Sequence, residues 1–168
     1  NLWIGTPEGL FMADFLKNKV KKFTNTADKN SISSSFISTL FIDSKKSIWV
    51  LAGGNWNVFN EKYQNFSKGN KKPGSGHSLM YLVETAEGIW VGSMDGGLVL
   101  VNRNTYKPIQ YFAFDALNPN SISNNSIMAL YTDHHGALWV GTNNGLNQYL
   151  AKLGSFKRYN LTDGIPEE

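Results

Sequence analysis

The sequence predicts an all-β protein, a segment of a β-propeller with about four blades of four antiparallel strands each. Three observations predict this class. A phrase containing Trp and Gly recurs, as "LWIGTPEGL" (2–10), "IWVGSMDGGL" (89–98) and "LWVGTNNGL" (138–146). Its tryptophans, together with Trp49 of a weaker copy, are 46, 41 and 49 residues apart, a spacing typical of propeller blades. No stretch keeps a helical hydrophobic period over three turns.

A longer alignment defines the repeat unit. Residues 30–50 and 120–140 align without a gap over 21 positions, of which nine are identical. Their offset of 90 residues equals two repeats, so they are expected to be equivalent parts of different blades. The predicted blades are residues 1–29, 30–73, 74–119 and 120–168. The first is partial because the chain opens on the second strand of a blade, which predicts fifteen strands and a first blade without its inner strand.

The four strands of a blade are clearest in the last copy. They are predicted at "SIMALYTD" (126–133), at "ALWVGT" (137–142), from "GL" (145–146) onward, and at "SFKRYN" (155–160). Short runs rich in Val, Ile, Tyr, Trp and Thr, bounded by Gly, Asn and Asp, are strand signals. The sequence therefore predicts strands joined by tight turns in every blade.

The connections carry the residues that tight turns require. Asp43 and Asp133 occupy one repeat position between the first two strands, where a carboxylate accepts hydrogen bonds from nearby backbone amides. Gly9 and Gly145 stand in the hairpin between the second and third strands. Large flat rings are predicted to fill the space between blades, and they belong to Trp3, Trp49, Trp90 and Trp139. The recurring phrase therefore indicates architecture rather than chemistry.

Composition narrows the classes of function. The chain has 168 residues, 41% hydrophobic and 17% charged, which is enough apolar material for a core. The net charge is +3, and the lysines of 17–22 alternate with apolar residues, which predicts a solvated strand face rather than a nucleic-acid stripe. Cysteine is absent, which excludes disulfides, thiolate metal sites and a Cys nucleophile. No run of 18 apolar residues predicts a transmembrane helix.

The recurring phrases "LWIGTPEGL", "IWVGSMDGGL" and "LWVGTNNGL" resemble the two-component regulator propeller repeat. The segments "NSIS" and "GALWVGT" inside 120–142 extend this resemblance. The copy "IWVLAGGNW" (48–56) departs from the pattern, with Leu51 in place of the strand glycine. The resemblance implies a periplasmic sensor domain of a (hybrid) two-component histidine kinase of the Bacteroidetes type, which responds to oligosaccharides. It also implies that kinase signalling and membrane attachment are carried by other parts of the parent protein, since this chain contains no kinase, receiver or DNA-binding motif.

The departure from the repeat at 48–56 suggests a place for a ligand. Trp56 stands between Asn55 and Asn57, and an aromatic ring with amides beside it is a combination that binds sugars. The alternative is that Trp56 fills the core position that Leu10 and Leu146 fill in other copies. Both interpretations remain open on the sequence.

Lys72 and His77, in the longest irregular loop, are further candidates for ligand contact. His134 and His135 lie in a predicted turn and are expected to be exposed and to point apart rather than to share a metal ion. No catalytic constellation, metal site or cofactor is predicted.

Three functions are compatible with these residues. The first is a ligand-sensing propeller segment, the second a non-catalytic scaffold or dimerisation module without a small ligand, and the third a propeller lyase or glycosidase. Open blade ends predict self-association as a homodimer, because unpaired strand edges favour association. No nucleic-acid partner is expected.

Overall fold

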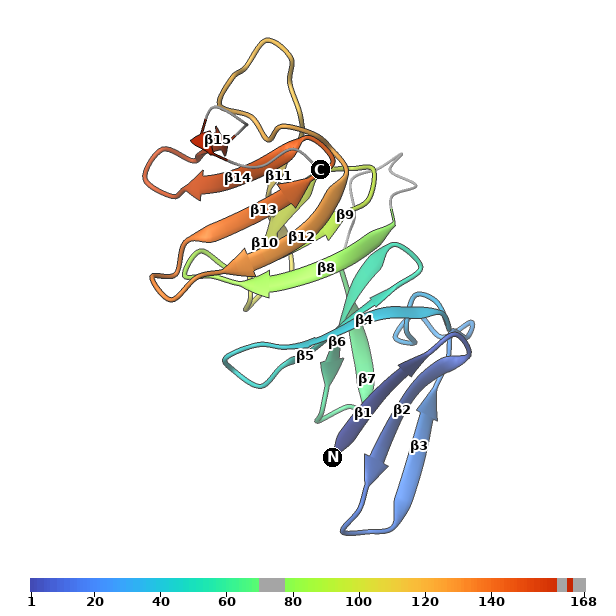
Figure 1. The fold of residues 1–168 in the computed structure, drawn as a ribbon. Helices are drawn as coiled ribbons and strands as arrows, with labels where there is room; N and C mark the ends of the chain where they lie inside the picture. The colour runs from blue at the N-terminus through green and yellow to red at the C-terminus, as the bar shows by residue number, and fades with distance from the viewer. Residues whose placement is uncertain (70–77, 160–162, 165–168) are drawn as a thin grey trace. The chain divides into compact units, whose positions relative to one another are not determined.

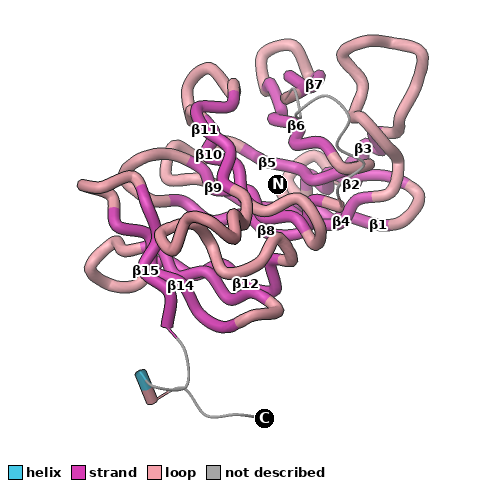
Figure 2. The backbone as a smooth tube through the Cα atoms, turned by 90° about the horizontal axis from the view of Figure 1, so that it is seen from above, coloured by secondary structure: helices cyan, strands magenta, loops and turns pink. Residues whose placement is uncertain are grey.

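The computed structural model describes residues 1–69, 78–159 and 163–164 and confirms the predicted all-β class. These residues form fifteen strands (Figures 1 and 2), and the short piece drawn as helix in Figure 2 is a single 3₁₀ residue, Asp163. The strands build one three-stranded and three four-stranded antiparallel sheets, and in each sheet strands that are consecutive in the chain are neighbours. The three-stranded sheet is the first, as expected for a blade that lacks its inner strand. Within the described residues, no helix is long and apolar enough to cross a membrane.

Contacts divide the chain into two compact units, residues 1–79 and 80–168. The sheets of the first unit consist of β1 (Leu2–Thr6), β2 (Gly9–Asp14) and β3 (Lys19–Phe23), and of β4 (Ile37–Ile42), β5 (Ile48–Ala52), β6 (Asn55–Asn60) and β7 (Asn65–Lys68). Those of the second unit consist of β8 (Leu79–Glu84), β9 (Ile89–Ser93), β10 (Leu98–Val101) and β11 (Pro108–Phe112), and of β12 (Ile127–Thr132), β13 (Leu138–Thr142), β14 (Gly145–Leu150) and β15 (Ser155–Tyr159). Only the first residue of β8 belongs to the first unit.

The turn between β12 and β13 shows why the aspartate recurs. One carboxylate oxygen of Asp133 accepts hydrogen bonds from the backbone N–H groups of His135 and Ala137, at 2.9 and 3.0 Å. The other accepts from the indole N–H of Trp139 at 2.8 Å. The same three kinds of hydrogen bond surround Asp43 in the turn between β4 and β5. A single side chain thus joins the turn to the tryptophan of the following strand.

The core of the first unit lies between its two sheets. The ring of Trp3 packs edge-on against Phe59 of β6, with 4.7 Å between ring centroids. Gly5 of β1 faces Ile37 of β4, and a Cβ at Gly5 would come within 2.7 Å of the Ile37 Cγ2. The buried hydrophobic residues of this core are Leu10, Phe23, Ile32, Ile37, Val50, Ala52 and Phe66.

The second unit repeats this packing. Trp90 lies 4.6 Å from the ring of Tyr149 between centroids, and Tyr149 is the counterpart of Phe59 at the 90-residue offset. Gly92 of β9 faces Ile127 of β12 as Gly5 faces Ile37. The buried residues of this core are Trp90, Leu98, Leu100, Phe112, Ile122, Ile127, Leu138, Val140, Tyr149 and Phe156. Trp3 and Trp90 therefore both pack between consecutive sheets of their unit.

Candidate functional site

The loop that connects β3 to β4 forms one wall of the candidate site. The Asp28 carboxylate accepts a hydrogen bond from the backbone N–H of Asn30 at 2.9 Å. The backbone N–H and the hydroxyl of Ser31 both donate to the Asp28 carbonyl, at 3.0 and 2.7 Å. The Asn30 carbonyl in turn accepts from the N–H of Phe66 in β7 at 2.9 Å. The loop is thus internally ordered and attached to the outer strand of the next sheet.

A buried asparagine holds the later part of this loop. The Asn57 carbonyl oxygen accepts hydrogen bonds from the N–H and the hydroxyl of Ser33, at 3.0 and 2.7 Å. Its amide nitrogen donates to the Val50 carbonyl at 3.2 Å. In the second unit the carbonyl oxygen of Asn147 accepts from the N–H of Ser123 at 2.9 Å. The Asn57 amide therefore belongs to the hydrogen bonding of the fold.

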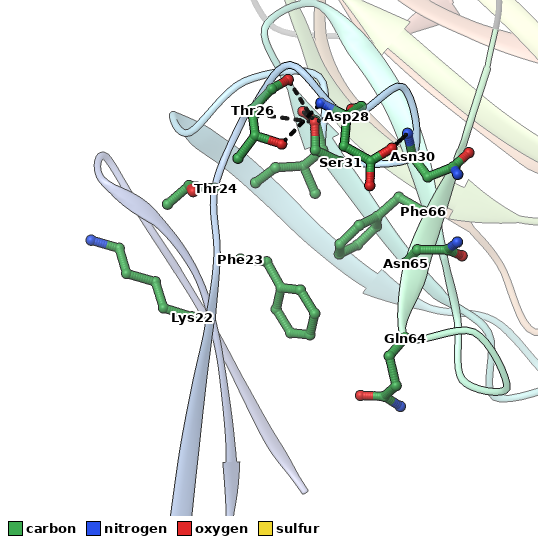
Figure 3. Close-up of a pocket in the computed structure, with 11 residues that line it drawn as sticks. Lys22, Phe23, Thr24, Thr26, Asp28, Asn30, Ser31, Gln64, Asn65 and Phe66 are labelled. Atoms are coloured by element: carbon green, nitrogen blue, oxygen red, sulfur yellow. Dashed lines mark hydrogen bonds between the residues drawn. The ribbon is translucent and has the colours of Figure 1, made fainter.

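A pocket of about 220 Å³ opens between this loop, the end of β3 and the start of β7 (Figure 3). Its apolar part contains Phe23 and Phe66, whose rings meet edge to face with 5.4 Å between centroids. The polar lining consists of Lys22, Thr24, Thr26, Asp28, Asn30, Ser31, Gln64 and Asn65. The pocket therefore combines a buried aromatic floor with a polar rim, a combination common in small-molecule sites.

The lining of the pocket contains residues of both charges and three residues with side-chain amides. Lys22 and Asp28 are the charged residues of the lining, and the Lys21 ammonium donates to the Gln64 side-chain oxygen at 3.2 Å. The carboxamides of Asn30 and Asn65 are half-buried and point away from Phe23 and Phe66 (Figure 3). Each such carboxamide offers two N–H donors and one oxygen acceptor.

The backbone at Gln64 has an unusual conformation for a residue with a side chain. Its φ is 53°, in the left-handed region, and the equivalent position in the second unit is Gly154 with a φ of 62°. For residues other than glycine this conformation costs about 1–2 kcal/mol. Asn18 and Tyr106 also have a positive φ in the turns before the outer strands of their sheets, so this conformation belongs to the repeated turn and is not special to the pocket.

In the second unit an arginine binds the corresponding loop. Arg158 of β15 donates to the carbonyl of Ser121 at 2.9 Å, to the Ser121 hydroxyl at 2.7 Å and to the Asn118 carbonyl at 3.0 Å. The counterparts of Ser121 and Asn118 in the first unit are Ser31 and Asp28, both of which line the pocket. At the position of Arg158 the first unit has Lys68, which is exposed.

The residues predicted from the break in the repeat lie elsewhere. Trp56 is fully buried, and a Cβ at Gly69 would collide with its indole ring. Asn57 is also fully buried, whereas Asn55 is half-buried and donates to the Gly53 carbonyl at 3.2 Å. The burial of Trp56 agrees with the alternative in which it fills a core position, and a ligand contact by these residues stays a prediction.

Lys72 and His77 lie outside the described residues. The expectation that His134 and His135 point apart is wrong, because their ring centroids are 3.8 Å apart. They lie in a tight turn rather than in an extended segment, so the alternation of a strand does not separate them. Both are exposed, and no group of three or more potential metal ligands occurs among the residues described.

The repeat pattern did not reveal the pocket residues, because the copies in the first and second units differ there at only a few positions. The signal is the pair of segments "YQNFSK" (63–68) and "LGSFKR" (153–158), which are equivalent at the 90-residue offset. Glycine and serine in the second segment are replaced by Gln64 and Asn65, and arginine by Lys68. Such differences between copies mark the pocket once the fold shows that these residues face one loop.

Comparison with known families finds one match inside the chain. Residues 121–144 match the family described as "Two component regulator propeller". This segment contains the start of the last blade and the phrase "LWVGT", so the match confirms the resemblance seen in the sequence. Comparison with curated proteins finds no match.

Solved structures with the same fold include the extracellular domains of two proteins from B. thetaiotaomicron, both assigned as hybrid two component systems. One is 19% identical, with a TM-score of 0.72 over 96% of this chain and 24% of that one. The other is 20% identical, with a TM-score of 0.71 over 92% of this chain and 21% of that one. Virginiamycin B lyase from Staphylococcus aureus is 14% identical, with a TM-score of 0.68 over 94% of this chain and 51% of that one. The chain thus spans about a quarter of the two extracellular domains, and the likeness shows a β-propeller fold.

Proposed function

We propose that this chain, whose last blade carries the two component regulator propeller repeat, is a ligand-sensing extracytoplasmic segment of a two-component sensor. The observation that carries the proposal is the family match over residues 121–144. The likeness to extracellular domains assigned to hybrid two component systems supports an extracytoplasmic, periplasmic location. In this proposal the segment binds and does not catalyse, and phosphoryl transfer belongs to other parts of the parent protein.

The ligand class we propose is oligosaccharide. A sugar carries hydroxyl groups that both donate and accept hydrogen bonds, and it has ring faces of low polarity. The first unit offers matching chemistry, because amide and hydroxyl groups surround a buried aromatic floor. Loops on a rigid sheet scaffold are also common sites of binding.

A thermal-shift measurement tests this function. The chain would be heated with a panel of oligosaccharides, and a bound sugar is expected to raise the unfolding temperature. At ten times the Kd, mass action stabilises the folded state by about 1.4 kcal/mol, which corresponds to roughly 3–6 °C for a domain of this size. Specific binding gives a shift that saturates with concentration, whereas an excluded osmolyte does not saturate. A panel with no saturating shift would contradict an oligosaccharide sensor.

A second function, as a scaffold or dimerisation module, is favoured by one feature of β1. This strand pairs with β2 alone among the described strands, and Leu2 and Ile4 on it are 48% and 44% exposed. An open edge with apolar side chains is suited to pairing with another chain. Association without any sugar response would favour this second function.

A further inference from the structure

We infer that the turn between β2 and β3 is a contact site for an anionic lipid bilayer. The apolar side chains at its tip, Phe15 and Leu16, enter the headgroup region, and the lysines of β3 contact the lipid phosphates. This inference goes beyond the proposed sensing function and does not depend on a sugar ligand. The contact is additional to the membrane attachment expected of other parts of the parent protein.

Two large apolar side chains are adjacent at the tip of this hairpin. Phe15 is 76% exposed and Leu16 is completely exposed, and Figure 1 shows the turn at one end of the first sheet. The turn is ordered, because the Asp14 carboxylate accepts a hydrogen bond from the backbone N–H of Lys17 at 3.1 Å and lies 3.4 Å from its ammonium group. An ordered turn presents both side chains without a large further loss of backbone freedom on binding.

The other sheets have the same turn with a more polar tip. Asn60 and Asn102 accept hydrogen bonds from the backbone N–H three residues later, as Asp14 does, at 3.1 and 3.0 Å. The two tip positions that follow are occupied in the other sheets by Glu61 and Lys62, by Arg103 and Asn104, and by Ala151 and Lys152. Formation of the turn therefore does not require large apolar residues at the tip, and the presence of two of them in the first sheet needs another explanation.

Exposed lysines follow the tip on both faces of the sheet. The Lys21 ammonium lies 4.8 Å from the centroid of the Phe23 ring, on the face that carries the core. The Lys22 ammonium lies 5.3 Å from the centroid of the Phe11 ring, on the other face. Lys19 begins β3 beside the turn, and at about 3.3 Å per residue the three lysines lie within about 10 Å along the strand. The first sheet with its turns contains four lysines and two acidic residues, a net charge of +2.

An anionic bilayer matches this combination of groups. Apolar side chains gain by leaving water for the interface, and lysines beside them are attracted by the negative surface potential. Lysines on an outer strand also oppose pairing with another strand, but this role does not account for the apolar tip. A nucleic-acid backbone would contact the lysines and leave the aliphatic Leu16 in water. A second copy of the hairpin would cover the tip and bring like charges together.

One double variant separates insertion of the tip from attraction by charge. Phe15→Ala/Leu16→Lys gives this turn the tip residues of the β14–β15 turn, so the hairpin is expected to stay folded. It also adds a positive charge, so attraction by charge alone would strengthen its binding. Leu153→Ala, which removes an apolar side chain that is 73% exposed in the β14–β15 turn, is the matched control.

A second double variant tests the lysines. Lys19→Gln/Lys21→Gln removes two positive charges next to the tip, at exposed positions of β3. Lys45→Gln/Lys46→Gln removes the same charge from exposed positions in the β4–β5 turn and is the matched control.

The experiment is flotation of the full chain with vesicles of phosphatidylcholine alone and of an equal mixture with phosphatidylglycerol. A small tip and a few lysines predict a Kd on the order of 0.1–1 mM lipid for the anionic vesicles, with weaker binding to the neutral ones and at high salt. We expect Phe15→Ala/Leu16→Lys to weaken binding about tenfold or more. Lys19→Gln/Lys21→Gln is expected to have an effect of similar size, since each lysine near the surface contributes about fivefold. Both controls should bind like the wild type.

Insertion can also be observed directly with tryptophan placed at the tip. Leu16→Trp is expected to add fluorescence that shifts to shorter wavelength on anionic vesicles and is quenched by lipids with brominated chains. Leu153→Trp, at the exposed position of the β14–β15 turn, should show neither change.

Each other outcome overturns the inference or a stated part of it. Binding that is unchanged or stronger in Phe15→Ala/Leu16→Lys would overturn insertion of the tip. Equal binding to neutral and anionic vesicles would overturn the role of the lysines. Absence of binding to both vesicles would overturn the membrane contact, and a smaller mass of the tip variant in light scattering would then assign the tip to contact between copies. None of these results depends on a sugar, so the sensing function is tested separately by the thermal shift.

Discussion

Single side chains that recur at one position of the repeat have the same partners in different blades. The indole N–H of Trp49 donates to Asp43 at 2.9 Å, and that of Trp139 donates to Asp133 at 2.8 Å. In the third blade the aspartate is replaced by a threonine, and its hydroxyl accepts from Trp90 at 2.9 Å. The repeat thus requires an oxygen acceptor at this position rather than a charge, because the N–H of a buried indole needs a partner.

The charge of Asp133 nevertheless makes stability depend on pH. The hydrogen bond from Trp139, followed by those from the backbone of Ala137 and His135, lowers the pKa of this carboxyl below its ordinary value. A carboxyl with a lowered pKa stabilises the folded state above the pKa of the unfolded chain, and this contribution is lost as the pH falls through the folded pKa.

We therefore expect Asp133→Asn to be less stable than the wild type near neutral pH and the difference to shrink at acidic pH. Urea unfolding of both proteins between about pH 7 and pH 3 measures this difference. A gap in unfolding free energy that stays constant over this range would show that the charge of Asp133 is not responsible. A gap that widens toward low pH would contradict the direction of the pKa shift.

Asn57 and Asn55 are expected to respond differently to truncation although both flank Trp56. Asn57→Ala removes the acceptor of Ser33 and leaves buried groups without partners, which is expected to lower the unfolding free energy by about 1–3 kcal/mol. Asn55→Ala loses one hydrogen bond of a half-buried side chain, to Gly53, and is expected to change stability by less than about 1 kcal/mol. Chemical denaturation of the two variants compares them. Equal losses would contradict the structural role assigned to Asn57.

At the scale of strands and sheets, the glycine of the recurring "WVG" sets how closely a strand approaches the side chains packed on it. In β9 a Cβ at Gly92 would lie 2.9 Å from the Ile127 Cγ2 of β12, so no larger residue fits without movement. In β13 a Cβ at Gly141 would meet the Cβ of Ala129 at 3.5 Å, an ordinary contact. Neither glycine has a left-handed backbone, so the two differ in packing and not in conformation.

The pair Gly92→Ala and Gly141→Ala tests this account of sheet packing. Gly92→Ala is expected to destabilise the protein by about 1–3 kcal/mol through overpacking. Gly141→Ala is expected to be neutral or to stabilise by about 0.4–1 kcal/mol, since alanine restricts the unfolded chain. Thermal unfolding of both variants is the measurement, and a larger loss for Gly141→Ala would contradict the packing account.

The strands themselves were largely predictable, because each hairpin depends on residues that are close in sequence. β12, at Ile127–Thr132, lies inside the predicted segment 126–133, and β15, at Ser155–Tyr159, inside 155–160. Asp133 marks the turn that ends β12, and Gly154 marks the turn that precedes β15. The hydrogen bonds that Ser33 donates to Asn57 were not predicted from the sequence. Both residues recur at the 90-residue offset, as Ser123 and Asn147, but recurrence by itself does not show that two residues 24 positions apart are in contact.

At the scale of the whole molecule, the two units have similar architecture and opposite charge. Residues 1–79 contain eleven lysines and five acidic residues, whereas residues 80–168 contain five basic and eight acidic residues. In the first unit β1 pairs with β2 alone among the described strands, and Leu2 and Ile4 on it are exposed. These features support the proposal that copies of the chain associate, both through the edge and through complementary charge.

The expected association can be tested by placing a charge on the open edge. Ile4→Lys should shift the chain from dimer toward monomer, because a lysine on an edge strand opposes pairing with another strand. Val20→Lys on β3, at the opposite edge of the same sheet and 70% exposed, is the matched control and should have no effect. Light scattering coupled to gel filtration gives the mass. A monodisperse wild-type monomer at high concentration would contradict self-association, and sensitivity to salt would indicate the contribution of charge.

The sequence by itself determined the repeat, the all-β class, the count of fifteen strands and the turn residues of "LWVGTNNGL". It could do so because strands and hairpins follow from local alternation and from residues suited to tight turns. Only the tertiary structure decided that Trp56 is buried, that Asn57 holds a loop, and that a pocket opens beside this loop in the first unit, whereas Arg158 binds the corresponding loop of the second unit. These outcomes depend on which side chains from distant segments meet, and a pattern along one chain does not contain the distances between them.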